Sequence, residues 1–280
     1  MNPISYLKLH LKRRKARRIT QEYPAVISTF NLKKEGKTDF ANWDNPLISP
    51  FLISQEMVDF FRKFIKEGDL VIDIGSNIGD TTMLMGLAAG STGTTLGFEP
   101  NPLVYKILEV NATLNKGRHN IIPLPYAISN KAEEYYYYSS EASFANGGIS
   151  KSKIKRNSKF VYPEKVKGIV LEDLLNRDYS DRVEKLSFIK VDTEGFDKEI
   201  IKSISSLIDR HKPVIVAECI KYSTPEEKEE LYNVISSHGY DIFYFSDFVS
   251  NAEIIKLNQC SDIHKWKETI NIYAVPTGKI

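Results

Sequence analysis

From residue 54 onward, short continuous apolar runs alternate with segments in which apolar residues recur every third or fourth position. The continuous runs are typical of buried β-strands, and the recurring pattern is typical of amphipathic helices. Strands that are apolar on both faces and alternate with helices predict a parallel sheet covered on both sides, an α/β fold. The predicted strands cover residues 70–74, 94–99, 121–128, 186–191, 214–219, 241–245 and 270–275. The predicted helices cover residues 54–67, 80–89, 101–115, 171–175, 197–208 and 225–238.

Two segments break this rhythm. Residues 21–50 contain three prolines and little periodicity, which predicts a linker or a strap across the domain. Residues 131–170 contain a strand-like run at 135–138, a turn at 146–148 and a basic loop at 151–159. We interpret this second segment as an insertion that forms a hairpin over the site.

Charge is unevenly distributed, although the net charge is only +2. The first twenty residues carry seven lysines and arginines and no acidic residue, and Ile4, Leu7 and Leu11 follow one another at helical spacing. This segment is predicted to be a helix that either contacts anionic lipid or is simply solvated. The predicted domains are therefore a basic helix with its linker at 1–50 and an α/β domain at 51–280.

Targeting signals are not evident in the sequence. No apolar run is long enough to span a membrane, and the basic head lacks the apolar stretch of a signal peptide. The two cysteines do not have a metal-type spacing and are expected to be reduced. We therefore expect a cytoplasmic protein, with residues 1–20 as the candidate for peripheral membrane contact.

A glycine-containing turn follows the first strand of the α/β domain. The turn runs from Gly75 to Gly79, and the next strand ends about twenty residues later at Glu99. A carboxylate at this place can accept hydrogen bonds from both hydroxyls of a ribose. The three-glycine dinucleotide pattern and the Gly-Lys-Ser/Thr phosphate loop are both absent, and the acidic Asp73 and Asp80 at the two ends of the turn suit a cation better than a phosphate. The turn thus favours S-adenosylmethionine over a nicotinamide cofactor.

Several motifs in the same order resemble those of the FkbM family of S-adenosylmethionine-dependent O-methyltransferases. The segment Asp73-Ile-Gly-Ser-Asn-Ile-Gly79 is similar to the family's D-[VI]-G-A-N-x-G, and Phe98-Glu-Pro-Asn-Pro102 is similar to its F-E-P-x-P. The resemblance spans roughly residues 54–275, with mild departures at Ser76, Glu172 and Thr193. Further similar segments are Asn111 with Asn115, Ala127-Ile-Ser-Asn130, Leu171-Glu-Asp-Leu174 and Lys190-Val-Asp-Thr-Glu-Gly195.

The resemblance implies a class I methyltransferase fold, a three-layer sandwich around a seven-stranded sheet whose last strand is antiparallel. It also implies a role for each matched residue at the cofactor. Asp73 would lie near the ammonium of the methionine part, and Glu99 would bind the ribose. The remaining implied contacts are Gly75, Asn77 and Gly79 with the methionine part, and Ser129 and Asn130 with the adenine. The acceptor would be a hydroxyl of a carbohydrate, a glycan or a secondary metabolite.

Three carboxylates are candidates for handling the proton of such an acceptor. Asp192 and Glu194 follow one predicted strand, and Glu218 lies near the end of another. Strand ends in a parallel sheet open onto one crevice, and residues two apart in extended chain share a face. We interpret Asp192 as the first choice of general base, with a magnesium ion held by Asp192 and Glu218 as the second possibility. Alternatively, Glu194 caps the next helix and Glu218 pairs with a lysine.

Aromatic residues of the insertion are the candidate acceptor surface. Tyr135 and Tyr137 would share one face of a strand, and Phe144 precedes a flexible turn. Such side chains could stack on sugar rings, or they could take part in ordinary cross-strand packing.

Other functions predict different observations. A nicotinamide-dependent oxidoreductase would need the missing three-glycine turn, and a non-catalytic module would bind S-adenosylmethionine without turnover. A nucleic-acid methyltransferase is favoured only by the basic head, so no nucleic-acid partner is expected. The oligomeric state is left open by the sequence.

Overall fold

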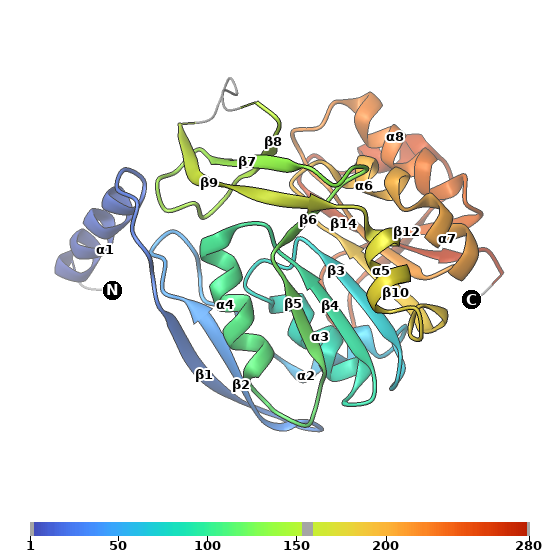
Figure 1. Ribbon diagram of the computed structural model, residues 1–280, viewed down its shortest axis with the longest axis horizontal. Helices are drawn as coiled ribbons and strands as arrows, with labels where there is room; N and C mark the ends of the chain where they lie inside the picture. The colour runs from blue at the N-terminus through green and yellow to red at the C-terminus, as the bar shows by residue number, and fades with distance from the viewer. Residues whose placement is uncertain (1–2, 153–158, 279–280) are drawn as a thin grey trace.

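The computed structural model describes residues 3–152 and 159–278, and Figure 1 shows their arrangement around a central twisted sheet. This sheet has eight strands in the order β13-β12-β14-β11-β10-β3-β4-β5. Strands β5, β4, β3, β10 and β11 pair in parallel, and β14 is antiparallel to both of its neighbours. The bounds are β3 Leu70–Ile74, β4 Thr94–Phe98, β5 Ile121–Leu124, β10 Leu186–Val191, β11 Val214–Cys219, β12 Tyr240–Phe245, β13 Ile254–Leu257 and β14 Ile270–Pro276.

This topology confirms the predicted class I methyltransferase fold and its antiparallel last strand. The strand number is corrected from seven to eight, because β13 adds an antiparallel edge strand to β12. Strand β13 has only four residues, of which only Leu257 is buried, so the sequence pattern does not reveal it.

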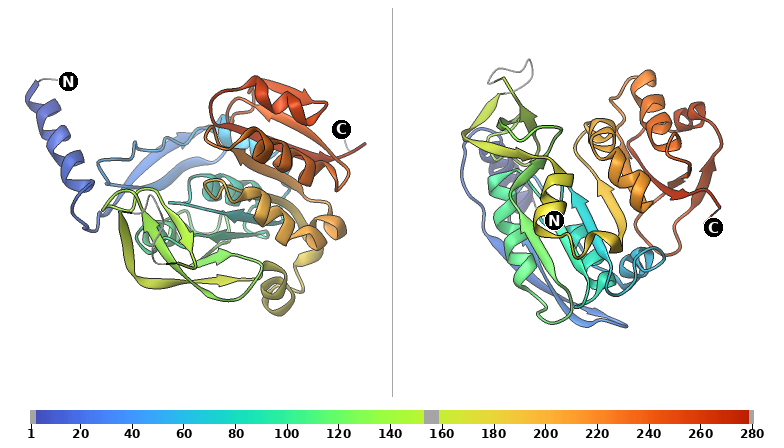
Figure 2. Two further views of the ribbon diagram at one scale, coloured as in Figure 1. Left: turned by 90° about the horizontal axis from the view of Figure 1, so that it is seen from above. Right: turned by 45° about the vertical axis from the view of Figure 1, so that its right-hand side comes forward.

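Helices cover both faces of the sheet, as Figure 2 shows from two further directions. Alternating strand residues point to opposite faces, so that Val71 belongs to one apolar cluster and its neighbour Ile72 to the other. Helices α2, α3 and α4 pack into the first cluster, and α5 to α8 pack into the second. Their bounds are α2 Gln55–Phe61, α3 Asp80–Ala89, α4 Pro102–Thr113, α5 Leu171–Asp178, α6 Asp197–Ser203, α7 Ser205–His211 and α8 Pro225–Ser236, with short 3-10 turns at Val183–Lys185 and Cys260–Lys265.

The largest differences from the predicted helices occur at two places. The helix expected at 54–67 ends at Phe61, where the chain tightens so that the amide of Phe64 donates to the carbonyl of Phe61. The helix expected at 197–208 is divided at Ile204 into α6 and α7.

The segment expected to be a linker or strap contains a β-hairpin, formed by β1 (Ala25–Leu32) and β2 (Gly36–Trp43). The side chains of Asn111 and Asn115, on and just after α4, each donate to and accept from the backbone of β2, at Ala41 and Asp39. These two asparagines thus fix the hairpin against the domain.

The predicted insertion belongs to a separate four-stranded sheet with the order β6-β9-β7-β8. The strand expected at 121–128 is interrupted at Pro125, so that β5 stays in the main sheet while β6 joins the second sheet. Most of the basic loop expected at 151–159 lies outside the described residues. The strands are β6 Tyr126–Ile128, β7 Glu134–Ser139, β8 Gly148–Ser150 and β9 Phe160–Ile169.

The first helix, α1 (Pro3–Ala16), projects away from the domain (Figures 1 and 2). Among the described residues, no helix combines the length and the apolar character that a membrane crossing requires.

Candidate active site

A cavity of about 590 Å³ lies where β3, β4, β10 and β11 end. Three groups of residues surround it. One wall, here called the β3–β4 wall, comprises Gly75, Asn77, Asp80, Phe98 and Glu99. The opposite wall, the β10–β11 wall, comprises Asp192, Thr193, Glu194 and Glu218. The second sheet closes the cavity with the cover, defined as Tyr135, Tyr137 and residues 145–151.

The turn after β3 brings the two walls into contact. Gly75 has a φ of +81°, and a Cβ atom there would lie 1.8 Å from the carbonyl oxygen of Asp192. Only glycine combines this left-handed conformation with so close an approach. The sequence analysis identified Gly75, and the structure shows why no residue with a side chain fits there.

Glu99 is held in a fixed orientation at the edge of the cavity. One carboxylate oxygen accepts from the amide of Asn77 at 2.9 Å, and the other accepts from the amide of Asn101 at 2.7 Å. Each oxygen keeps a second lone pair for a ligand. Burial raises the pKa of Glu99 to about 7, against the two amides, which lower it.

Asp73 does not line the cavity, in contrast to the expectation that it would meet a ligand ammonium. Its carboxylate is fully buried and accepts from the hydroxyls of Thr81 and Thr82 at 3.0 and 2.6 Å. It also lies 3.4 Å from the ammonium of Lys190. Asp73 therefore anchors the start of α3 below the turn. Gly79 is also outside the cavity lining, and it forms the left-handed N-cap of α3.

Lys190 connects the strand ends below the two walls, through a buried ion pair with Asp73 and a partly buried one with Asp192. Its ammonium lies 3.1 Å from Asp192 and 3.4 Å from Asp73, and its side chain is only 4% exposed. Burial by itself would lower the pKa of Lys190. The carboxylates of Asp192, Asp73 and Asp80 outweigh this effect and raise the pKa above its usual value, so the lysine stays charged. The apolar run that predicts β10 contains Lys190, but only the pairing of Lys190 with Asp73 across the strands shows its role.

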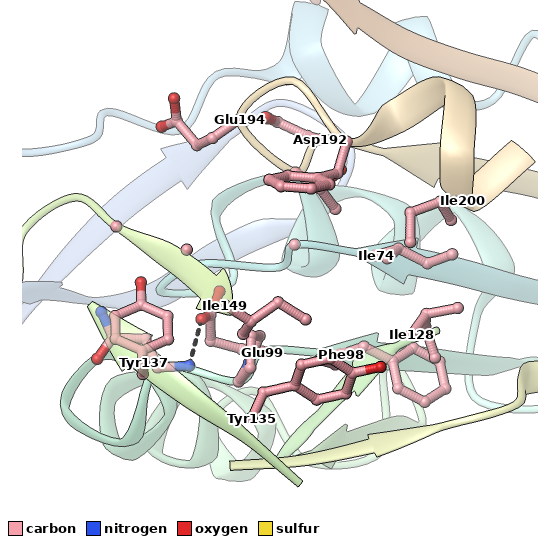
Figure 3. A pocket seen from close by; sticks show the side chains of 18 of the residues that line it. Ile74, Phe98, Glu99, Ile128, Tyr135, Tyr137, Ile149, Asp192, Glu194 and Ile200 are labelled. Carbon is pink, nitrogen blue, oxygen red and sulfur yellow. Dashed lines mark hydrogen bonds between the residues drawn. The ribbon is translucent and has the colours of Figure 1, made fainter. Parts of the chain in front are cut away.

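The three predicted catalytic carboxylates all line the cavity, but two of them are arranged differently from expectation. Strand β10 ends at Val191, and Glu194 has a φ of +54°, so Asp192 and Glu194 are not alternate residues of one extended strand. Figure 3 shows both across the cavity from Glu99, Tyr135 and Tyr137. In the part of the chain that the structure describes, no lysine pairs with Glu218. Asp197, and not Glu194, accepts hydrogen bonds from backbone amides here, namely those of Thr193 and Glu218.

Burial and mutual repulsion change the protonation of these carboxylates. Burial, followed by the charges of Asp192, Glu194 and Asp197, raises the pKa of Glu218 to about 8. Burial and then Asp192 also raise the pKa of Glu194. Perturbed carboxyl groups of this kind are typical of catalytic clefts.

The donor set on this wall does not match a magnesium site. Over the described residues, no group of three or more acidic, histidine or cysteine side chains is placed to hold a metal ion. In addition, the ammonium of Lys190 already neutralises Asp192, one of the two expected ligands. We therefore assign no step to a metal ion.

Ser129 and Asn130 line the cavity, and their contact with the adenine stays a prediction. The hydroxyls of Ser129 and Tyr135 lie 2.6 Å apart, which ties the strand end of β6 to β7. Tyr135 and Tyr137 are both buried and both line the cavity, so they share a face as predicted. Burial, followed by the nearby Glu99, raises the pKa of Tyr137 well above its usual value, so its hydroxyl stays protonated.

Asp80 and Asn101 are two further residues of the site. Asp80 lines the cavity at the start of α3, and burial raises its pKa to about 6. The sequence signal for Asp80 is its place at the end of the glycine turn. Asn101 lines the cavity and donates to the carbonyl of Phe144, which fixes the cover to the end of β4. No sequence pattern indicates this long-range contact.

The chain was compared with known proteins. It is 27% identical over 162 residues to a hexuronic acid methyltransferase, AglP, of Haloferax volcanii, an alignment that covers 58% of this chain and 61% of that protein. A methyltransferase FkbM structure from Methylobacillus flagellatus has a TM-score of 0.47 at 14% identity, covering 75% of this chain and 44% of the other. A SAM-dependent O-methyltransferase of Thermotoga maritima has a TM-score of 0.41 at 11% identity, covering 90% and 78%.

The family comparison gives a match over most of the α/β domain. The model of the methyltransferase FkbM domain matches residues 73–242, which include the glycine turn, Glu99 and all three carboxylates of the β10–β11 wall. The chain therefore belongs to the FkbM family of methyltransferases.

Proposed function

We propose that this protein transfers a methyl group from S-adenosylmethionine to a hydroxyl group of a carbohydrate or glycan. The observation that carries the proposal is the arrangement of Glu99. Its two oxygens are oriented by backbone amides, and it lies beside the glycine turn at the end of the second strand. A carboxylate held in this way is suited to accept hydrogen bonds from both hydroxyls of a ribose.

The charge of the cavity fits this cofactor. The sulfonium and ammonium groups of S-adenosylmethionine are cations, and acidic side chains, among them Asp80 and Glu99, line the cavity. A dinucleotide would instead bring a pyrophosphate, which needs backbone donors at a helix N-terminus and not a row of carboxylates. The site therefore favours the sulfonium cofactor over a nicotinamide one.

When bound, the cofactor supplies a methyl group that is already activated for displacement. The protein has to orient the acceptor hydroxyl and accept its proton. We assign Glu218 the role of accepting the proton of the acceptor hydroxyl, because its raised pKa of about 8 makes its carboxylate a stronger base than an ordinary glutamate. Asp192, which the sequence suggested first as the base, is paired with Lys190. We assign it the role of orienting the acceptor hydroxyl.

The carbohydrate acceptor is supported by two observations. The relative from Haloferax volcanii is a hexuronic acid methyltransferase. In addition, the aromatic side chains of Tyr135 and Tyr137 of the cover line the cavity. Aromatic rings and hydroxyls are suited to contact sugar rings.

The test is transfer of a labelled methyl group to a panel of neutral and uronic acid glycans, using wild type and Glu218→Gln. General base catalysis contributes about 100-fold or more, so the variant should lose about 100-fold in kcat and keep its affinity for S-adenosylmethionine. Glu199→Gln is the matched control, since Glu199 also lines the cavity and belongs to α6.

The pH dependence separates a base from a merely structural carboxylate. Glu218 must be deprotonated to accept a proton, so the activity of wild type should rise with pH and level off above about 8. The residual activity of Glu218→Gln should lack this rise. Cofactor binding without methyl transfer to any glycan would contradict the proposal and favour a non-catalytic binding module.

A further inference from the structure

The N-terminal helix α1 carries exposed leucines on the face that is turned away from the molecule. Leu7 and Leu11 are 58% and 54% exposed, although a helix of a soluble domain normally buries such residues. They are four positions apart and so lie on one face, whereas Ala16, which is fully buried, lies on the opposite side. The Nε of Arg13 donates to the carbonyl of Pro46 at 3.0 Å, which also fixes the side of α1 that faces the domain.

Basic side chains surround these leucines. At the helical spacing, Lys8, Arg14 and Lys15 lie beside the leucine face, and the first twenty residues contain no acid. Across the described ranges, no carboxylate pairs with these three cations. An exposed helix with apolar residues between unpaired cations is complementary to an anionic lipid surface, where the cations meet headgroups and the leucines enter the interface.

The base of the helix is connected to the cover of the cavity. The Nε of Arg17 lies 3.2 Å from Glu141, and the amide of Ala142 donates to the carbonyl of Arg17 at 3.3 Å. A few residues later the same segment lines the cavity at 145–151. The C-terminal end of α1 therefore lies near the cover, and the helix projects outward from there (Figures 1 and 2).

We infer that α1 docks the protein on an anionic membrane surface, with Leu7 and Leu11 entering the lipid interface. A nucleic acid or another polyanion would use the cations but would leave both leucines in water. The leucines thus distinguish a lipid partner from other acidic partners. The inference is independent of the acceptor and of the methyl transfer proposed above.

The test measures co-sedimentation of the full-length protein with vesicles of phosphatidylcholine alone and of phosphatidylcholine with phosphatidylglycerol. Binding should need the anionic lipid. The double variant Arg14→Glu/Lys15→Glu should bind at least about tenfold more weakly, because each cation near an anionic surface contributes on the order of fivefold. The matched control is Lys66→Glu/Lys116→Glu, which changes the net charge equally at two exposed lysines outside α1 and should bind as wild type does.

A second variant tests the leucines without changing the charge. Leu7→Ser/Leu11→Ser should reduce vesicle binding at least about tenfold, and it should leave binding to heparin, a soluble polyanion, unchanged. The expected preservation of the far-ultraviolet circular dichroism spectrum checks the fold of each variant. Equal binding of this variant and wild type to anionic vesicles would overturn the inference, as would wild-type binding to heparin but not to vesicles.

Discussion

The two walls of the cavity differ in how their charges are satisfied. On the β3–β4 wall, each carboxylate oxygen of Glu99 accepts from a backbone amide, and the Asp73 carboxylate beneath accepts from two threonines and faces Lys190. On the β10–β11 wall, burial and the nearby charge of Asp192 raise the pKa of both Glu194 and Glu218, and among the described residues no backbone amide offsets this.

This difference indicates what each wall does. A wall whose polar groups are oriented by the backbone is pre-organised for one ligand, and binding then costs little reorganisation. A wall with competing carboxylates is less stable by itself, because burying like charges costs free energy, but such groups have the shifted pKa values that proton transfer needs. The difference supports the division proposed above, in which the first wall binds the methyl donor and the second binds the acceptor and accepts its proton.

Removing the ion pair between the walls should have the largest effect. Lys190→Met leaves the buried Asp73 and the half-buried Asp192 without their cation, and losing one partner of a buried pair costs about 3–5 kcal/mol. Urea denaturation measures this loss. Lys198→Met is the control, since its pair with Glu230 is solvent-exposed on the glutamate side and should cost about 1 kcal/mol or less. Equal losses in the two variants would show that Lys190 does not join the walls energetically.

Affinity for the methyl donor tests the first wall. Glu99→Gln removes the negative charge. It also places the side-chain NH₂ group, a donor, opposite a backbone N–H that donates to the carboxylate in the wild type. We expect binding of S-adenosylmethionine to weaken about 100-fold, or about 2.7 kcal/mol, by isothermal titration calorimetry. Glu67→Gln, at an exposed glutamate outside the cavity lining, should bind normally. An unchanged affinity in Glu99→Gln would remove the observation on which the proposed function rests.

The contact between the walls can be tested with two glycines of similar conformation. Gly75 and Gly36 have φ values of +81° and +70°, but a Cβ atom would clash with Asp192 only at Gly75 and would meet nothing within 4 Å at Gly36. Both alanine variants cost the left-handed strain, about 1–2 kcal/mol. Gly75→Ala should cost about 2 kcal/mol more, measured by urea denaturation. If the two variants are equally stable, the walls are not in tight contact at this point.

The sequence predicted the site best where its parts are close together in the chain. The strands 70–74, 186–191 and 214–219 have the predicted limits, because each is a continuous apolar run that the core requires. Gly75, Asn77 and Glu99 were also identified correctly as cavity residues, since local chemistry marks each of them. The hairpin at 25–43 was missed, because polar residues stand among its few buried apolar ones and its place depends on the distant Asn111 and Asn115.

The sequence by itself determined the order of strands and helices, the family motifs and the residue types that meet at the strand ends. Local patterns record these features because each depends on neighbouring residues. The tertiary structure alone decided that Lys190 lies between Asp73 and Asp192, that Asp73 is withdrawn from the cavity and that the second sheet closes over it. These contacts join residues up to 117 positions apart, and their energy depends on burial and strand register, which no short stretch of sequence contains.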